Sequence, residues 1–317
     1  MTPEWPVWPA DPWDEIRRRD EPEGGWVRSC LLGGRDPLRT MTPLDDALGG
    51  GLMPGVTVLG GRASAGKSSL ACQCAANIAA SGGRVLYLTL DDSWGNVWAR
   101  CASAWSCTEE AKRLNAKPFS WGAVASERDA LRQAPHDEDM GRWEFNVVQR
   151  PGMARTATLF AEGPGRNLAV VDSVSEIGEA LDMAASLPKP PALMVVDYVQ
   201  QYATGDEKTD ATEYTRVSKV AQDIQRAALR MQMPVLELSC LRKLAKGDDE
   251  PTLDWFRGSG TVGYAAQAAC VLTQREDAGS KGGRPVSMHV VKNKSGRAGF
   301  ELPAVLWGQY SCLRKER

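Results

Sequence analysis

The chain has 317 residues, of which 43% are hydrophobic and 25% are charged, and its formal net charge at pH 7 is −2. This composition is typical of a globular protein with one large domain, or one domain and an extension. The balanced charge argues against a globally basic nucleic-acid coat, although it permits a narrow basic channel. No apolar run reaches the length of a membrane span, and the N-terminus has no signal-peptide pattern, which predicts a cytoplasmic protein.

The N-terminal residues 1–35 differ in character from the rest of the chain. They place Trp5, Trp8, Trp13 and Trp26 among prolines and acidic residues. A segment this short cannot bury four tryptophans by itself. We therefore expect it either to fold back on the main domain or to dock on a neighbouring chain or another protein. The predicted organisation is an N-terminal arm, residues 1–35, followed by one large domain, residues 36–317.

The stretch "GGRASAGKSS" contains the pattern G-x-x-x-x-G-K-[ST], met by Gly61, Gly66, Lys67 and Ser68. It follows a short apolar run typical of a buried strand and precedes a segment with helical spacing, which is the context this phosphate-binding motif requires. An ordinary glycine turn is the alternative. Backbone N–H groups would surround a phosphate, Lys67 would reach the terminal phosphates, and Ser68 would bind Mg²⁺. The predicted nucleotide-binding residues are Gly61, Arg62, Ala63, Ser64, Ala65, Gly66, Lys67, Ser68 and Ser69, and the predicted cofactors are ATP and Mg²⁺.

Beyond the arm, apolar strands alternate with helical stretches, which predicts an α/β fold with a mostly parallel sheet flanked by helices. The predicted strands are Val56–Leu59, Val85–Leu90, Leu168–Val171, Leu193–Val196, Val235–Leu238, Ala269–Thr273 and Val286–Val291. Predicted helices include Val174–Ala185 and Tyr214–Met231. The polar region 107–155 indicates helical connections in its early part and no definite structure in its later part.

Three carboxylates follow predicted strands. Asp197 comes directly after "LMVV", the place of a Walker B aspartate that holds Mg²⁺, although a surface aspartate that merely ends a strand would look the same. Asp91 and Asp92 follow "VLYLTL", and one of them could orient the attacking water. The alternative is that both cap the following helix.

Several segments, taken in chain order, carry a family resemblance. "LDDALGGGLMPGVTVLGGRASAGKSSLA" is similar to the entry segment and phosphate loop of the RecA-type motor domain in DnaB-type replicative helicases. "VLYLTLDD" resembles that family's strand ending in Ser-Leu-Glu, so Asp91 stands where the family has its catalytic glutamate. "LMVVDYVQQY" is close to Ile-Asp-Tyr-Leu-Gln-Leu and is the most specific match. The resemblance implies a RecA-like P-loop NTPase fold.

Three later segments extend the resemblance, which covers roughly residues 35–310. "VSKVAQDIQRAALRMQMPVLELSCLRK" resembles a helix and strand ending in Ser-Gln-Leu-Asn-Arg. "WFRGSGTVGYAAQAACVLTQ" is similar to the segment with Leu-Arg-x-Ser-Gly, and "VVKNKSGRAG" resembles Lys-Asn-Arg-x-Gly. The family likeness implies a homo-oligomeric, six-membered ring with ATP between subunits. Lys292 and Lys294 would then reach the next subunit's γ-phosphate; a solvated hairpin turn is the alternative.

The chain departs from the family at three positions. Lys294 occupies the arginine-finger position, and lysine cannot make the bidentate fork of arginine. Cys240 replaces the glutamine that senses the γ-phosphate, and Asp91 is one methylene shorter than the family's glutamate. Each change predicts slow or altered hydrolysis. The N-terminal helical domain of the replicative enzymes has no counterpart in the 1–35 arm.

In the family, the loops after the Walker B strand and after the next strand hold single-stranded DNA. The second of these loops supplies Arg242, Lys243 and Lys246, which we predict to contact phosphates. Tyr202 and Trp255 are candidate stacking residues for single strands. Acidic residues follow in both loops, so the motor is better supported than its track.

The leading functional hypothesis is an ATP-driven, ring-forming DNA helicase or translocase of plasmid, phage or accessory type, with single-stranded DNA as partner. The alternative is an ATP-switched assembly protein of the RecA, RadA or KaiC kind, which the Lys-x-Lys pair and Cys240 favour. A degenerate ATP-binding scaffold is a third hypothesis, and the complete phosphate loop together with Asp197 argues against it.

Overall fold

The computed structural model of the chain describes residues 36–124, 151–243, 250–258, 260–275 and 282–316. From Leu38 onward the chain forms one compact unit. The predicted N-terminal arm, residues 1–35, lies outside the described residues, so its docking stays a prediction.

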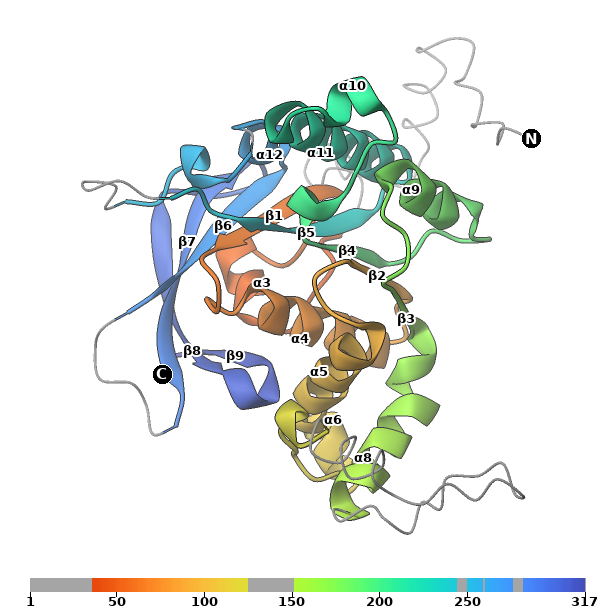
Figure 1. Ribbon diagram of the computed structural model, residues 1–317. Coiled ribbons are helices and arrows are strands. Elements are labelled where there is room, and N and C mark those ends of the chain that lie inside the picture. The colour runs from red at the N-terminus through yellow and green to blue at the C-terminus, as the bar shows by residue number, and fades with distance from the viewer. Residues whose placement is uncertain (1–35, 125–150, 244–249, 259, 276–281, 317) are drawn as a thin grey trace, which may run out of the picture. The chain divides into compact units, whose positions relative to one another are not determined.

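A nine-stranded sheet in the order β3-β2-β4-β5-β1-β6-β7-β8-β9 runs through the described part of the chain (Figure 1). Neighbouring strands from β3 to β6 are parallel, and those from β6 to β9 are antiparallel. The strands are β1 (Gly55–Gly61), β2 (Val85–Thr89), β3 (Leu168–Val171), β4 (Leu193–Asp197), β5 (Pro234–Cys240), β6 (Ala268–Gln274), β7 (Arg284–Asn293), β8 (Phe300–Trp307) and β9 (Cys312–Lys315). The predicted α/β class with a mostly parallel sheet is confirmed.

Helices cover both faces of the sheet, with α4 and α5 on one face and α9 and α11 on the other (Figure 1). The α-helices are α3 (Pro43–Leu48), α4 (Lys67–Ala80), α5 (Trp94–Ser106), α6 (Glu109–Arg113), α8 (Pro151–Glu162), α9 (Ile177–Ser186), α10 (Glu207–Asp210), α11 (Glu213–Arg230) and α12 (Gly260–Ala265). Short 3₁₀ turns are η2 (Pro164–Asn167), η3 (Val199–Gln201), η4 (Leu253–Trp255) and η5 (Gly308–Tyr310). None of the described helices is both long and apolar enough to cross a membrane.

The two faces of the sheet bury different helices for reasons visible in their sequences. Small residues such as Ala71, Cys72 and Ala75 let α4 pack closely on the central strands, and each is fully buried. The α11 helix is amphipathic: its buried positions Val217, Val220, Ala221 and Ile224 recur three or four residues apart, and the rest of its surface is polar. Two apolar layers therefore enclose the strands, which explains why the central strands are hydrophobic on both sides.

All seven predicted strands are present, whereas one predicted helix begins later than expected and β8 and β9 were not predicted. The predicted helix Val174–Ala185 begins at Ile177, because Ser175 and Glu176 pair with Ala203 instead of continuing the helix. Pro303 lies within β8, and a proline weakens a strand pattern because it has no N–H to donate. The expected free thiols at Cys72 and Cys74 are confirmed as buried and unbridged.

Candidate nucleotide site

The phosphate loop connects buried strand β1 to helix α4, as the motif requires. Gly66 adopts φ 106°, a conformation that favours glycine, and a Cβ there would lie 2.7 Å from Leu306 Cδ2 on β8. At Gly61 a Cβ would lie 3.0 Å from the Ala65 Cβ and 3.2 Å from the Leu272 carbonyl oxygen. The loop is thus held between β8 and β6 at positions that admit no larger side chain. Arg62, Ala63 and Ser64 remain exposed at its tip.

Lys67 begins α4 and folds over the loop. Its ammonium donates hydrogen bonds to the carbonyl oxygens of Gly61 at 2.8 Å and Arg62 at 3.2 Å. Burial lowers the Lys67 pKa, while the nearby Cys240, Asp197 and Asp91 act in the opposite direction. The lysine is therefore placed between its own loop and two of the predicted acidic residues.

Asp197 ends β4 and is 3% exposed, so it is not a surface residue that merely ends a strand. The Tyr87 hydroxyl donates to Asp197 Oδ2 at 2.8 Å. Burial raises the Asp197 pKa, and hydrogen bonds from Tyr87 and Ser68 oppose that shift. The two predicted metal residues, Ser68 and Asp197, therefore lie in direct contact although β5 separates their strands.

The structure separates the two carboxylates that follow β2. Asp92 is tied to the start of α5: it accepts hydrogen bonds from the Asn96 amide group at 2.6 Å and the Ser93 N–H at 2.9 Å, and it pairs with Arg100 at 3.4 Å. Asp91 is exposed, and the Gln201 amide group donates to its Oδ1 at 3.1 Å. Asp91 also lies within electrostatic range of Lys67 and Asp197. The structure thus gives Asp92 the helix-capping position and leaves Asp91 facing the loop.

Cys240 ends β5, directly opposite Gly61 in the parallel register. Its thiol is half-buried, and burial raises its pKa while the Lys67 ammonium acts in the opposite direction. Gln200, in the turn after Asp197, accepts a hydrogen bond from the Cys240 N–H at 3.3 Å and donates to the Ser239 hydroxyl at 2.8 Å. This glutamine fixes the end of β5 against the Walker B turn, a role that the linear motif did not indicate.

Ser68 and Asp197 supply hard oxygen donors, which suit Mg²⁺. No cluster of three or more His, Cys, Asp or Glu side chains that could hold a metal lies within the described ranges. Mg²⁺ fits such a site because it keeps several waters and takes further oxygens from nucleotide phosphates. The residues present are therefore compatible with a cation that binds together with a nucleotide.

Lys292 and Lys294 lie at the end of the sheet opposite to the phosphate loop. Gly61 is in register with Leu272, whereas Thr57 is in register with Ala268, which pairs with Asn293. Lys292 Nζ donates to the carbonyl oxygens of Gly263 at 3.2 Å and Tyr264 at 2.5 Å, and Lys294 is exposed. These lysines cannot reach the site of their own chain.

Arg284 was missed by the sequence analysis, although it contacts the phosphate loop. It begins β7, and its guanidinium donates to the Ser64 carbonyl oxygen. No local motif marks this arginine. Its position follows from the antiparallel pairing of β7 with β6, which brings the start of β7 to the loop's edge of the sheet.

The predicted nucleic-acid residues are placed unevenly. Arg242 donates from Nε to the Asp254 carbonyl oxygen at 2.9 Å, Lys243 is exposed, and Lys246 lies outside the described residues. Tyr202 and Trp255 are 1% and 4% exposed, so the expectation that they could stack on bases is wrong. Their rings fill the apolar layer under α11, which the sequence could not reveal because both follow polar loop residues.

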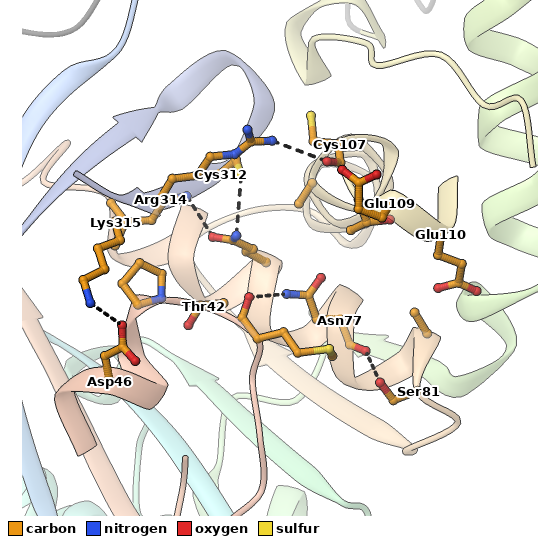
Figure 2. Close-up of a pocket in the computed structure, with 17 residues that line it drawn as sticks. Thr42, Asp46, Asn77, Ser81, Cys107, Glu109, Glu110, Cys312, Arg314 and Lys315 are labelled. Carbon is orange, nitrogen blue, oxygen red and sulfur yellow. Dashed lines mark hydrogen bonds and ion pairs between the residues drawn. The ribbon is translucent and has the colours of Figure 1, made fainter. Parts of the chain in front are cut away.

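A separate cavity of about 610 Å³ lies away from these residues (Figure 2). Its lining includes Thr42, Asn77, Ser81, Cys107, Cys312 and Arg314, from α3, α4, the end of α5 and β9. None of the phosphate-loop residues lines it. The candidate nucleotide site is thus formed by the edge of the sheet and is distinct from this cavity.

A glycine loop after a buried strand, a lysine and a serine on the following helix, and a buried aspartate two strands away define the protein class: this is a P-loop nucleotide-binding protein. Residues 167–303 match the family model described as DnaB-like helicase C terminal domain. The chain therefore carries a RecA-like domain of the DnaB type, as the sequence motifs predicted. None of the curated protein sequences compared with the chain matches it.

Solved structures with the same fold support this assignment. One of them, described as the ATPase domain of a larger protein, is 17% identical with a TM-score of 0.65, over 96% of this chain and 98% of that one. A DnaB-like replicative helicase, described with its interactions with primase, is 15% identical with a TM-score of 0.68, over 96% of this chain and 70% of that one. A KaiC-like protein, PH0186 from Pyrococcus horikoshii OT3, is 14% identical with a TM-score of 0.54, over 89% and 99%. The fold is RecA-like.

Proposed function

We propose that this protein is an ATP-hydrolysing, ring-forming DNA helicase or translocase that acts on single-stranded DNA in the cytoplasm. The observation that carries the proposal is the convergence of Lys67, Ser68, Asp197 and Asp91 at one edge of the sheet, while Lys292 and Lys294 lie at the opposite edge. A site whose two halves lie on opposite ends of one domain is completed when a second copy brings its lysines to the first. Closed rings of such heterologous contacts are a common assembly.

In the proposed site, loop N–H groups and Lys67 bind the phosphates, and Ser68 and Asp197 hold Mg²⁺, which would neutralise charge on the phosphate oxygens. Asp91, held by Gln201, would orient the attacking water. Lys294 of a neighbouring subunit would stabilise charge that develops on the transferred phosphoryl group. Lys67 would exchange its bonds to the Gly61 and Arg62 carbonyls for phosphate oxygens when ATP binds.

The first test is ATP hydrolysis by the full chain with and without single-stranded DNA. We expect single strands to stimulate hydrolysis, and we expect Lys67→Ala to reduce it by roughly 10²- to 10³-fold because the phosphate charge loses its main cation. Phosphate release at saturating ATP measures both effects, with Lys67→Ala as the blank. Hydrolysis that does not respond to DNA would contradict the translocase proposal.

A second candidate function is an ATP-switched assembly protein without translocation. Cys240 beside Lys67 favours it, because a thiol cannot donate the amide hydrogen bond that a glutamine would offer to the γ-phosphate. Slow hydrolysis with ATP-dependent oligomerisation and no response to DNA is the result expected for this function.

Completion of the site by a neighbour predicts subunit complementation. Lys67→Ala and Lys294→Ala should each be nearly inactive alone, whereas an equimolar mixture should recover part of the activity. Recovery is expected because the intact loop of the Lys294→Ala chain can face the intact Lys294 of the Lys67→Ala chain. Hydrolysis rates of the mixture and of each variant at equal total concentration measure this effect. If the mixture showed only the mean of the two variants, Lys294 would not act between subunits.

A further inference from the structure

Asp197 has a buried partner that does not belong to the phosphate loop. Tyr87 lies on β2, its side chain is fully buried, and its hydroxyl donates to Asp197 Oδ2 at 2.8 Å. The two strands are neighbours, with Thr89 opposite Asp197 in the register. Tyr87 and Asp197 therefore point to the same face of the sheet, two residues apart along it.

The hydroxyl of Tyr87 is itself directed by a neighbour. Cys72 on α4 donates its S–H to the Tyr87 oxygen at 3.9 Å, and Cys101 on α5 forms a hydrogen bond with Cys72. A phenol has one proton, so a donor on its oxygen favours the orientation in which that proton is given to Asp197. Burial and the adjacent Asp197 raise the pKa of Tyr87, so the proton stays on the phenol. The direction of the bond is therefore set from the Tyr87 side.

Tyr87 differs in kind from the other side-chain donor to Asp197. Ser68 also bonds this carboxylate, but under the proposed function Ser68 is a metal ligand whose position depends on the cation. Tyr87 is held by the core between β2 and α4 and has no access to the nucleotide. It is thus the partner that can orient the carboxylate whether or not a ligand is present.

We infer that Tyr87 is a positioning residue: its hydroxyl holds Asp197 in the orientation in which the carboxylate receives hydrated Mg²⁺. The inference rests on the proposed function, because it assigns a role to the same site. Groups that orient metal-binding carboxylates from behind typically change metal affinity or activity by about 10- to 100-fold when they are removed. A tyrosine that served only to fill the core would change stability alone.

The test compares Tyr87→Phe with a matched control, Tyr202→Phe. Tyr202 is likewise buried, at 1% exposure, and lies close enough to Asp197 for its pKa to be affected. Among the described residues, its hydroxyl has no hydrogen bond with Asp197. Both variants lose one oxygen from a buried tyrosine near the same carboxylate, so a difference between them reports the Tyr87–Asp197 bond.

The readout is the Mg²⁺ concentration that gives half-maximal binding of a fluorescent ATP analogue, followed by anisotropy. Tyr87→Phe is expected to raise this concentration by about 10-fold, with Tyr202→Phe unchanged. Binding of the analogue in EDTA, which reports the phosphate loop alone, should be the same for wild type and both variants. Thermal melting of each variant separates a loss of folding from a loss of metal affinity.

A second variant keeps the inference testable if Tyr87→Phe does not fold. Cys72→Ala leaves the hydroxyl in place but removes its donor, so a shift of about threefold in the same direction is expected. An unshifted Mg²⁺ dependence in Tyr87→Phe, or equal shifts in Tyr87→Phe and Tyr202→Phe, would overturn the inference while leaving the proposed function intact. A wild-type chain that fails to bind the analogue would overturn both.

Discussion

The Asp197→Asn variant is expected to lose ATP hydrolysis by about 100-fold or more while melting at a higher temperature than the wild-type chain. The carboxylate is 3% exposed, and burial raises its pKa, so the folded state binds this proton more tightly than the unfolded state does. At neutral pH, the ionised form therefore costs stability. Asparagine removes the charge and can still accept the Tyr87 hydrogen bond, but it cannot neutralise Mg²⁺.

The control is Asp92→Asn, which should give the opposite pattern. Asp92 pairs with Arg100 and holds the start of α5, so its loss should lower the melting temperature and leave hydrolysis largely intact. Calorimetry without nucleotide and phosphate release at saturating ATP and Mg²⁺ measure the two effects. If Asp197→Asn hydrolysed ATP at the wild-type rate, the Walker B assignment would be wrong. A fall in its melting temperature would contradict the argument from burial.

The second large effect concerns Glu237, at the centre of β5. Its side chain is 1% exposed, its Oε1 has no hydrogen-bond partner in the described part of the chain, and Val58 and Val196 flank it on the adjacent strands. Burial raises the Glu237 pKa from 4.5 to about 8. Between these values, the unfolded chain is ionised at this residue while the folded chain holds the proton. Stability at this residue is therefore highest in acid and falls as pH rises to about 8.

Glu237→Gln has the shape of the protonated acid and does not titrate, so the two proteins together isolate this one group. We expect the unfolding free energy of the wild type to fall relative to the glutamine variant by about 1.4 kcal/mol per pH unit between about pH 5 and 8. The difference should level off above that range. Urea denaturation of both proteins at unit intervals of pH measures it. Parallel stability curves would show that Glu237 is ionised in the folded state.

Asp197 and Glu237 place acidic groups in one buried sheet, and the two variants separate a functional carboxylate from one without an assigned function. Asp197 has hydrogen-bond donors and lies beside the phosphate loop, and a loss of stability there is the usual cost of a preorganised site. Glu237 faces the layer under α11, where its register neighbours are apolar. Replacing Asp197 should alter activity, whereas replacing Glu237 should alter only the pH dependence of stability.

Local sequence determined the core of the candidate site. The spacing of Gly61, Gly66, Lys67 and Ser68 specifies a loop and a helix start within one short segment, so no distant contact is needed to predict it. Apolar runs located all seven predicted strands because central parallel strands are hydrophobic on both faces. Asp197 was predictable for the same reason, since a carboxylate directly after a fully apolar run is conspicuous.

Only the tertiary structure decided which neighbours these residues have. Asp91 and Asp92 are adjacent in sequence and equivalent as carboxylates, yet Arg100 and Asn96 hold one of them while Gln201 contacts the other. Strand order places β5 between β1 and β4 and turns β7 around, so that Arg284 meets the phosphate loop and Lys292 lies at the far end of the sheet. Such contacts join residues far apart in the chain, and they depend on strand order and packing, which a linear pattern does not encode.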